Sequence, residues 1–370
     1  MKTSLFRLSA FVMLAAVLLA ACATPATTAA PQPTQPPQVV EVTRVVAGTP
    51  VVEQVVVTAT PPPAEPEKVF RVAIVMPSAI TDMAFSQSMY DGLVAVQTEM
   101  GGPDKMEIAY SEGMFKVPDA AAALRDYASQ GYNLVIAHGS QYGTSLKEIA
   151  PEFPETSFAW GTSLDTFQAD GVTNVFAYQA EAQQGGFVLG TIAALMSQSG
   201  VIGISGPVEA GDAKLYVDGF KNGCVTAKPD AQVNVSYTGS FSDVSLMAAA
   251  AETHIAAGAD MLTGSSQSVV GAIGVAKDKG AFWFGTQWDQ TSLAPEAVIA
   301  SQLYDWTGII KDMMASHKAG VLGGKSYTLT FKNEGLKIVY NSAITVPDDV
   351  KAAAEAAIAG IKDGTIKPLP

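Results

Sequence analysis

Cysteine and histidine are scarce in this chain, whose 370 residues include two cysteines and three histidines. Cys22 follows a predicted leader, so only Cys224 remains for the folded part, which excludes an internal disulfide and a CxxC or zinc site there. His138, His254 and His317 have no metal-ligand spacing. We therefore expect neither a metal nor a cofactor.

Positive charge is also sparse: 22 Lys and Arg residues face 35 Asp and Glu residues, and the formal net charge is -13. This balance argues against nucleic acid or an anionic membrane surface as a partner. The loop from Pro77 to Asp82 lacks the G-x-G-x-x-G of dinucleotide-binding enzymes, and no Walker A or G-x-S-x-G motif occurs. We expect a protein that is not an enzyme.

The first residues have the pattern of a secretory signal, with Lys2 and Arg7 before an apolar run from Leu8 to Leu19. Leu-Ala-Ala directly before Cys22 resembles a bacterial lipobox. We expect a signal peptide over residues 1–21 and a lipid on Cys22; the alternative is an ordinary signal peptide with an incidental cysteine. Cleavage would move the net charge from -13 to -15.

Residues 22–67 are dominated by Ala, Thr, Pro, Val and Gln. The valine-rich pieces Val39–Val46 and Val51–Val57 could form two strands, but a lone pair buries little. We favour an extended tether between the lipid and the folded part.

From Lys68 onward, apolar strand-like runs alternate with runs of helical period, which indicates parallel sheets covered by helices. The pattern restarts near Gly200, and about three hundred residues exceed one core. We expect an α/β fold of two Rossmann-like lobes joined by a three-crossing hinge. Lobe 1 would hold residues 68–179 and 302–325, lobe 2 residues 180–301 and 326–345, and a C-terminal helix and tail residues 346–370.

The first strand of the folded part, Val69 to Val75, ends before a polar loop and a predicted helix from Phe85. Ligands of parallel sheets bind at the carboxyl ends of strands, where Asp82, Phe85 and Gln87 stand. The alternatives are that Phe85 packs into the core at the helix start and that Asp82 caps the helix.

At this point the sequence resembles a known family. TDMAFSQSMYDGL is similar to the D-x-x-F-N-Q-x-x-x-x-G-L motif of the basic membrane protein (PnrA-like) substrate-binding lipoproteins, which have a type I periplasmic-binding fold. The likeness continues through NVFAYQAEAQQGGFVLGTIAALMSQSGVIGISG, GFKNGCVTAKPDAQV, YTGSFSD, GADMLTGSSQS and AKDKGAFWFGTQWDQ. It covers roughly Val69 to Val339.

The resemblance implies purine or nucleoside binding and gives roles to individual residues. Phe85 matches the aromatic residue that stacks on the base. Asp82, Ser86 and Gln87 match the loop around it, and Tyr142 falls where many members have an acidic residue. Gly264 and Ser265 belong to the small-residue loop that approaches the ligand from lobe 2.

Two positions depart from the nucleoside-binding pattern. Gln287 stands where those members have an aspartate that holds ribose hydroxyls, and Tyr304 stands where they have a lysine. The missing carboxylate removes a strong acceptor for a diol. The surrounding residues look more like a branch that includes free-base binders, so nucleoside and nucleobase both stay open.

Four more residues are candidates for the ligand site because of their place at strand ends: His138, Trp160, Trp288 and Asp289. Either tryptophan could wall the cleft by stacking or pack between elements, and Asp289 could bind ligand or cap a turn.

The sequence thus predicts an extracytoplasmic lipoprotein, anchored to the cell membrane, that binds a purine-type small molecule and delivers it to the permease and ATPase of an ABC importer. The alternatives keep the fold but bind a flavin, a thiamine-like compound or a sugar, or act as a ligand-dependent sensor.

Overall fold

The computed structural model describes residues 38–46, 49–57 and 68–369, in two compact units, Met1–Pro66 and Glu67–Pro370. The predicted signal peptide and Cys22 lie outside the described residues. Strands β1 (Gln38–Val46) and β2 (Thr49–Val57) pair antiparallel. The two valine-rich pieces therefore form a pair of strands, which is the alternative to the extended conformation favoured from the sequence. β-branched residues favour strands, and pairing satisfies the backbone N–H and C=O groups.

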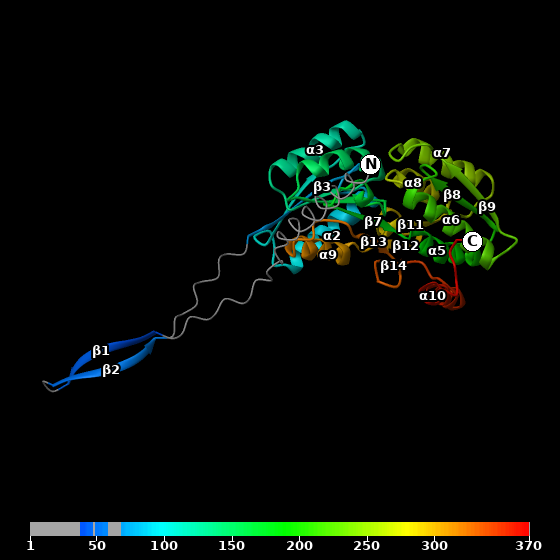
Figure 1. The fold of residues 1–370 in the computed structure, drawn as a ribbon. Coiled ribbons are helices and arrows are strands. Elements are labelled where there is room, and N and C mark those ends of the chain that lie inside the picture. Colours follow the sequence, from blue (N-terminus) through cyan, green and yellow to red (C-terminus); the bar gives the residue numbers. More distant parts are fainter. Residues whose placement is uncertain (1–37, 47–48, 58–67, 370) are drawn as a thin grey trace, which may run out of the picture. The chain divides into compact units, whose positions relative to one another are not determined.

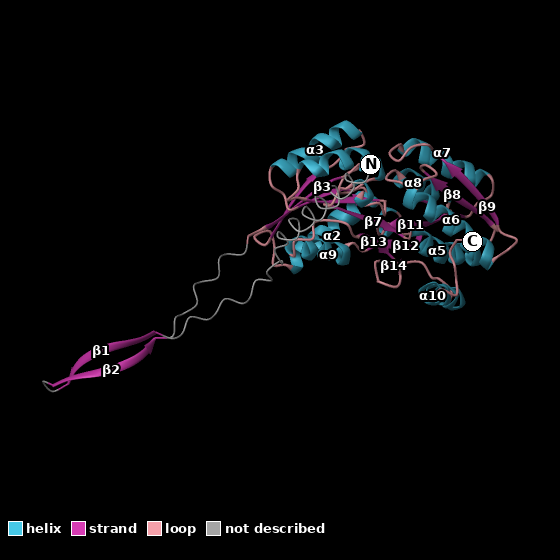
Figure 2. Ribbon diagram, in the orientation of Figure 1, coloured by secondary structure: helices cyan, strands magenta, loops and turns pink. Residues whose placement is uncertain are grey.

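The second unit contains two six-stranded sheets, each with helices on both faces (Figures 1 and 2). The sheet of lobe 1 has the order β13-β7-β6-β5-β3-β4 and is parallel throughout. Its strands are β3 (Phe70–Val75), β4 (Met106–Ser111), β5 (Leu134–Ala137), β6 (Ser157–Gly161), β7 (Val175–Ala180) and β13 (Ser326–Leu329). Its helices are α2 (Phe85–Glu99), α3 (Val117–Ser129), α4 (Gly143–Ile149) and α9 (Thr307–Lys318), with 3-10 turns at Ser140–Tyr142, Ala150–Glu152 and Gln168–Asp170.

Strand β3 explains why both faces of this sheet are covered. Val72 and Ile74 belong to the core cluster that includes residues of α2 and α9, whereas Ala73 and Val75 belong to the cluster that includes residues of α3 and α4. Figure 1 shows α3 on one side of β3 and the pair α2 and α9 on the other. An apolar run with no polar face can only be accommodated in this way.

The sheet of lobe 2 has the order β14-β12-β11-β10-β8-β9, and only its edge strand β14 is antiparallel. The strands are β8 (Val201–Gly206), β9 (Gln232–Tyr237), β10 (Met261–Gly264), β11 (Phe282–Gln287), β12 (Val298–Tyr304) and β14 (Leu336–Tyr340). The helices are α5 (Ala182–Met196), α6 (Gly211–Ala227), α7 (Val244–Ala256), α8 (Val269–Lys279) and α10 (Asp348–Asp363), with a 3-10 turn at Thr291–Leu293. Each helix among the described residues is too short or too polar to cross a membrane.

The chain passes between the lobes three times: after β7, after β12 and after β13. One predicted boundary is wrong, because β13 pairs with β7 in lobe 1, with Ser326 opposite Ala177, although residues 326–345 were expected in lobe 2. The free edge of β7 takes up this short strand before the chain crosses back. The sequence of β13, Ser-Tyr-Thr-Leu, carries no signal that would choose between two sheet edges.

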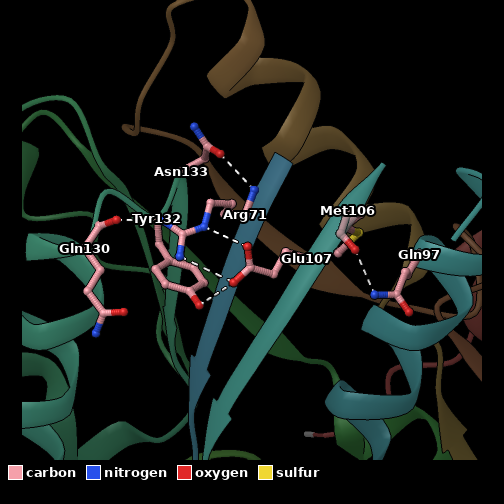
Figure 3. Close-up of polar contacts among 7 residues, drawn as sticks. All are labelled: Arg71, Gln97, Met106, Glu107, Gln130, Tyr132 and Asn133. Atoms are coloured by element: carbon pink, nitrogen blue, oxygen red, sulfur yellow. Dashed lines mark hydrogen bonds and ion pairs between the residues drawn. The ribbon is translucent and has the colours of Figure 1, made fainter. Parts of the chain in front are cut away.

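The amino ends of the lobe 1 strands are joined by a polar network (Figure 3). Arg71 of β3 donates to Glu107 of β4, with Nε 2.8 Å from Oε2, and Tyr132 donates to the same carboxylate. The hydrogen bond from Arg71 lowers the pKa of Glu107. Such a half-exposed pair contributes little to stability. It marks the sheet end opposite to the one where ligands of parallel sheets bind.

Candidate ligand-binding site

A cavity of about 240 Å³ lies where the carboxyl ends of the two parallel sheets face each other. Lobe 1 lines it with residues that follow β3, β4, β5 and β6, and lobe 2 with residues at or after the ends of β8, β9, β10 and β11. The lining residues are Pro77, Phe85, Phe115, Gly139, Ser140, Gln141, Thr162, Ala210, Gly211, Asp212, Ala213, Phe241, Ser265, Ser266, Gln267 and Gln287. Strand topology therefore places every wall of the cavity where parallel sheets bind ligands.

Three phenylalanines give the cavity its flat apolar surfaces: Phe85 and Phe115 from lobe 1 and Phe241 from lobe 2. The Phe85 ring stacks on the imidazole of His138, with the ring centroids 3.7 Å apart and the planes 9° from parallel. His138 is held by Tyr178, whose hydroxyl lies 2.7 Å from Nδ1, and by the carbonyl of Phe85. Because the imidazole stacks on one face of the Phe85 ring, the ring is held in place and can serve as a stacking surface for a ligand.

Lobe 2 contributes unpartnered polar atoms. Buried side-chain atoms without a hydrogen-bond partner belong to four lining residues, and all four come from lobe 2. They are Asp212 Oδ1, Ser265 Oγ, Gln267 Oε1 and Gln287 Oε1. Leaving such atoms without partners costs about 1–3 kcal/mol each. A cavity that gathers four of them is suited to a ligand that carries hydrogen-bond donors.

Asp212 is the only charged residue among those that line the cavity. It is 4 % exposed, and Oδ2 accepts a hydrogen bond from the backbone N–H of Ala180 at 3.3 Å. Removal from water raises the pKa of this carboxyl to about 7. Among the residues that the structure describes, no lysine or arginine lines the cavity, so an anionic ligand would meet the Asp212 carboxylate without a compensating cation.

The backbone is strained at two lining residues that are not glycine. Thr162 has a φ of 61° and Gln287 a φ of 73°, both in the left-handed region. Such conformations cost free energy and persist where the surrounding structure imposes them. Thr162 directly follows β6 and Gln287 is the last residue of β11, so the strain lies where these strands end at the cavity.

Of the twelve predicted ligand-binding residues, Phe85, Ser265 and Gln287 line the cavity. Asp82 instead caps α2, where its carboxylate accepts from the backbone N–H groups of Ala84, Ser86 and Gln87. Burial raises the pKa of Asp82 even though these donors lower it.

The polar residues after Phe85 support the same turn and do not line the cavity. Ser86 is buried and its Oγ accepts from Ser78 N–H at 3.2 Å, while Gln87 Oε1 accepts from Met83 N–H at 2.9 Å. These bonds fix the loop between β3 and α2 and thereby the position of Phe85.

His138, Tyr142 and Trp160 lie behind the lobe 1 wall. Burial lowers the pKa of His138 to about 3, so the ring is neutral. Tyr142 donates to the carbonyl of Met114 at 2.7 Å, and Trp160 donates to the carbonyl of Gly139 at 3.2 Å. Each side chain thus positions a loop that does line the cavity.

Gly264, Trp288 and Asp289 flank the lobe 2 wall. A Cβ on Gly264 would lie 2.7 Å from the carbonyl oxygen of Ser205, so the close strand packing requires glycine. Asp289 accepts from Thr291 N–H within its own turn, and Trp288 is half-buried beside it. Trp306, which lies between β12 and α9, is fully buried and donates to Ser88.

The sequence interpretation missed Phe115, Gln141, Asp212 and Phe241 among the lining residues. Each follows a strand of a parallel sheet, so the rule that directed attention to the loop after β3 applied to them as well. Among the described residues there is no group of three or more histidine, cysteine or acidic side chains that could hold a metal ion.

A cavity between two doubly wound lobes linked by three crossings is the architecture of the periplasmic-binding-protein-like folds. The model of the family described as "ABC transporter substrate-binding protein PnrA-like" matches residues 69–366, and the chain belongs to this family. The resemblance and the predicted fold class are confirmed. As a solute-binding protein of an ABC transporter it is not an enzyme, it works outside the cytoplasm, and its partners are a ligand and a transporter.

Curated relatives include a purine-binding protein of Brucella abortus (strain 2308), 30% identical over 266 residues that cover 72% of this chain and 74% of that protein. The transcriptional activator protein med of Bacillus subtilis (strain 168) is 27% identical over 262 residues, covering 70% of this chain and 79% of its own. A solved solute-binding protein from Conexibacter woesei has a TM-score of 0.65 at 21% identity and covers 82% of this chain and 99% of its own.

Proposed function

We propose that this solute-binding protein takes up a purine base or purine nucleoside in the cavity between its lobes. The observation that carries the proposal is the pairing of flat apolar surfaces with unpartnered acceptors. Phe85 and Phe115 on one lobe and Phe241 on the other suit a planar ring, since stacked aromatic pairs contribute about 0.5–1.5 kcal/mol beyond burial. The N–H groups at the edge of a purine suit the acceptor atoms of lobe 2.

The charge of the cavity favours the unphosphorylated forms. A nucleotide would bring a phosphate into a cavity whose charged lining residue is the carboxylate Asp212, and among the described residues no basic side chain lines it. The purine-binding relative from Brucella abortus supports the same ligand class. Because Gln287 replaces the aspartate expected to hold a ribose diol, base and nucleoside are both candidates, and the binding test decides between them.

We further propose that residues 22–67 tether the protein to the cell membrane through a lipid on Cys22 and that the loaded protein docks on an ABC importer. The sequence before Cys22 supports the lipid, and incorporation of a labelled fatty acid that is lost in Cys22→Ser is its test.

The proposal predicts a ligand-induced thermal shift. A ligand at one hundred times its dissociation constant stabilises the fold by about 2.7 kcal/mol, which raises the melting temperature by a few degrees. We expect this shift with adenine, with adenosine or with both, and none with the corresponding nucleotide. Stabilisation only by sugars, amino acids, flavin or thiamine would contradict the purine assignment and leave the class of protein unchanged.

Replacing the Phe85 stacking surface tests the site. We expect Phe85→Ala to weaken purine binding by about 2 kcal/mol or more, because the ligand loses its stacking surface. Phe153→Ala is the matched control, since Phe153 is half-buried in lobe 1 and does not line the cavity. Equal affinities of Phe85→Ala and wild type for every ligand that binds would show that the ligand lies elsewhere.

A further inference from the structure

The burial of the Asp212 carboxylate, with one oxygen unpartnered, is not explained by a role in the fold. Aspartate in the first turn of α6 is favoured by the helix dipole, but this does not require the side chain to be 4 % exposed or one oxygen to lack a partner. Oδ2 accepts from Ala180 N–H, while Oδ1 is buried and accepts from nothing. A buried carboxylate is stable only with hydrogen bonds or a cation.

No cation compensates Asp212. The groups that interact with it electrostatically are Glu181 at the start of α5, Tyr178 of β7 and Tyr304 of β12, and none of them is positively charged. On α6 itself, Lys214 pairs with Asp218, with Nζ 2.7 Å from Oδ2. No described group donates to Oδ1, and the Tyr304 hydroxyl, which interacts with Asp212, is itself buried without a partner. A molecule that enters the cavity can supply the missing donor to Oδ1.

The neighbouring acceptors differ from Asp212 in one respect. Gln267 and Gln287 also carry unpartnered oxygen atoms, but an amide can rotate and present its NH₂ group instead. Ser265 likewise either donates or accepts. Above its pKa of about 7, Asp212 is an ionised carboxylate that only accepts, so in that state it alone among these four residues imposes a donor on the ligand.

We propose that Asp212 is the specificity-determining residue of the cavity, accepting through Oδ1 a hydrogen bond from an N–H or O–H group of the bound purine or nucleoside. The inference rests on the proposed function, because it takes the ligand class from there. The donor is either the exocyclic amine of the base or a ribose hydroxyl. Ligands that place an acceptor or an anion at this point are rejected.

Asp212→Asn tests the proposal with little disturbance of the fold. The asparagine oxygen can still accept from Ala180 N–H, while its NH₂ group replaces the acceptor at Oδ1 with a donor. The full-length protein and the variant are titrated by calorimetry with adenine, hypoxanthine, adenosine, and 2′- and 3′-deoxyadenosine. Asp289→Asn is the matched control, since Asp289 bonds within its own turn and does not line the cavity.

We expect Asp212→Asn to lose roughly tenfold or more in affinity for the ligand that wild type prefers, and Asp289→Asn to lose none. If the amine is the donor, the variant also shifts preference from adenine toward hypoxanthine. If a hydroxyl is the donor, the deoxynucleoside that lacks it binds wild type and variant alike. Both patterns support the proposal and identify the contacted group.

Affinities within about twofold of wild type for all five ligands in Asp212→Asn, together with a loss in Phe85→Ala, would overturn the role of Asp212 and leave the purine site standing. Absence of binding of all five ligands to wild type would overturn both. Should the variant not fold, the pH profile of wild type decides. Affinity should fall as the pH is lowered and Asp212, whose pKa is raised by burial, takes up a proton. A profile that stays flat down to about pH 4, where even an aspartate without a shift is half protonated, contradicts the proposal.

Discussion

At the scale of single residues, burial has a different consequence for each of two side chains at the cavity, His138 and Asp212. His138 is buried and neutral, and it can therefore stack behind Phe85 without placing a positive charge in the wall. Asp212 is buried with one unpartnered oxygen, a state that destabilises the empty protein. A loss of folding stability of this kind is common at binding sites, where a side chain is retained for ligand binding although it does not stabilise the fold.

The cost at Asp212 predicts how stability changes with pH. Its pKa is raised from 3.8 to about 7 in the folded state, so the folded protein binds this proton more tightly than the unfolded chain. Asp212 by itself therefore lowers the free energy of unfolding of the ligand-free protein as the pH rises from about 4 to about 7, by up to a few kcal/mol in total. The Asp212→Asn variant cannot ionise at this position, so we expect its folding stability to lack this decrease.

Urea unfolding at about pH 4 and about pH 8 measures the effect. We expect the free energy of unfolding of Asp212→Asn to exceed that of wild type at the higher pH and to approach it at the lower. Shifts of other groups, such as the lowered pKa of His138, are shared by both proteins and cancel in the difference. Parallel pH profiles of the two proteins would show that Asp212 is not forced to ionise in a dry site.

At the scale of elements, the first two helices of lobe 2, α5 and α6, pack closely against each other. Gly186 and Gly190 of α5 lie against the backbone of Tyr216 and Phe220 on α6. Gly219 and Gly223 of α6 in turn lie against the backbone of Gln183 and Phe187 on α5. A Cβ on Gly190 would lie 2.0 Å from the carbonyl oxygen of Phe220. Because the obstacle is backbone on a packed helix, neither partner can move aside cheaply.

We expect Gly190→Ala to destabilise the fold by roughly 3 kcal/mol or more through overpacking. Gly274→Ala on α8 is the matched control, since a Cβ there meets nothing within 4 Å. This control should gain about 0.5–1 kcal/mol, because alanine is the better helix residue. Chemical unfolding of both variants checks the pair, and a Gly190→Ala protein as stable as wild type would mean that the helices are farther apart than described.

At the scale of the whole two-lobed unit, one buried side chain joins the lobes beside the cavity. Gln290 follows β11 in lobe 2 and is fully buried. Its Nε2 donates to the carbonyl of Met83 in lobe 1 at 3.1 Å, and its Oε1 accepts from Trp283. Met83 itself has a φ of 55°. This bond exists only while the two strand-end loops lie together, so it stabilises the present arrangement of the lobes.

We expect Gln290→Ala to raise the radius of gyration of the ligand-free unit in solution scattering and to weaken ligand binding several-fold, because closure becomes less favourable. Asn341→Ala is the control, since Asn341 donates to the carbonyls of Pro295 and Val298 within lobe 2. It should lower stability without changing the radius. Identical scattering of Gln290→Ala and wild type would show that other contacts hold the lobes.

Prediction from sequence succeeded where a local pattern is sufficient. The strand expected from Val69 to Val75 is β3, and the helix expected from Phe85 is α2. It was wrong for β13, whose short polar sequence pairs in lobe 1. Short strands take their partner from whichever sheet edge is free, which local sequence does not encode.

The sequence by itself determined the alternation of buried strands and helices, the two lobes and the family, because these follow from hydrophobic period and from motifs that lie contiguously along the chain. Only the tertiary structure decided which strand-end residues meet a ligand. Asp82 and Asp212 both stand at the start of a helix after a buried strand, yet Asp82 uses its oxygens on its own backbone and Asp212 lines the cavity. The physical reason is that the cavity exists only between the lobes, so its walls depend on contacts between segments far apart in the chain.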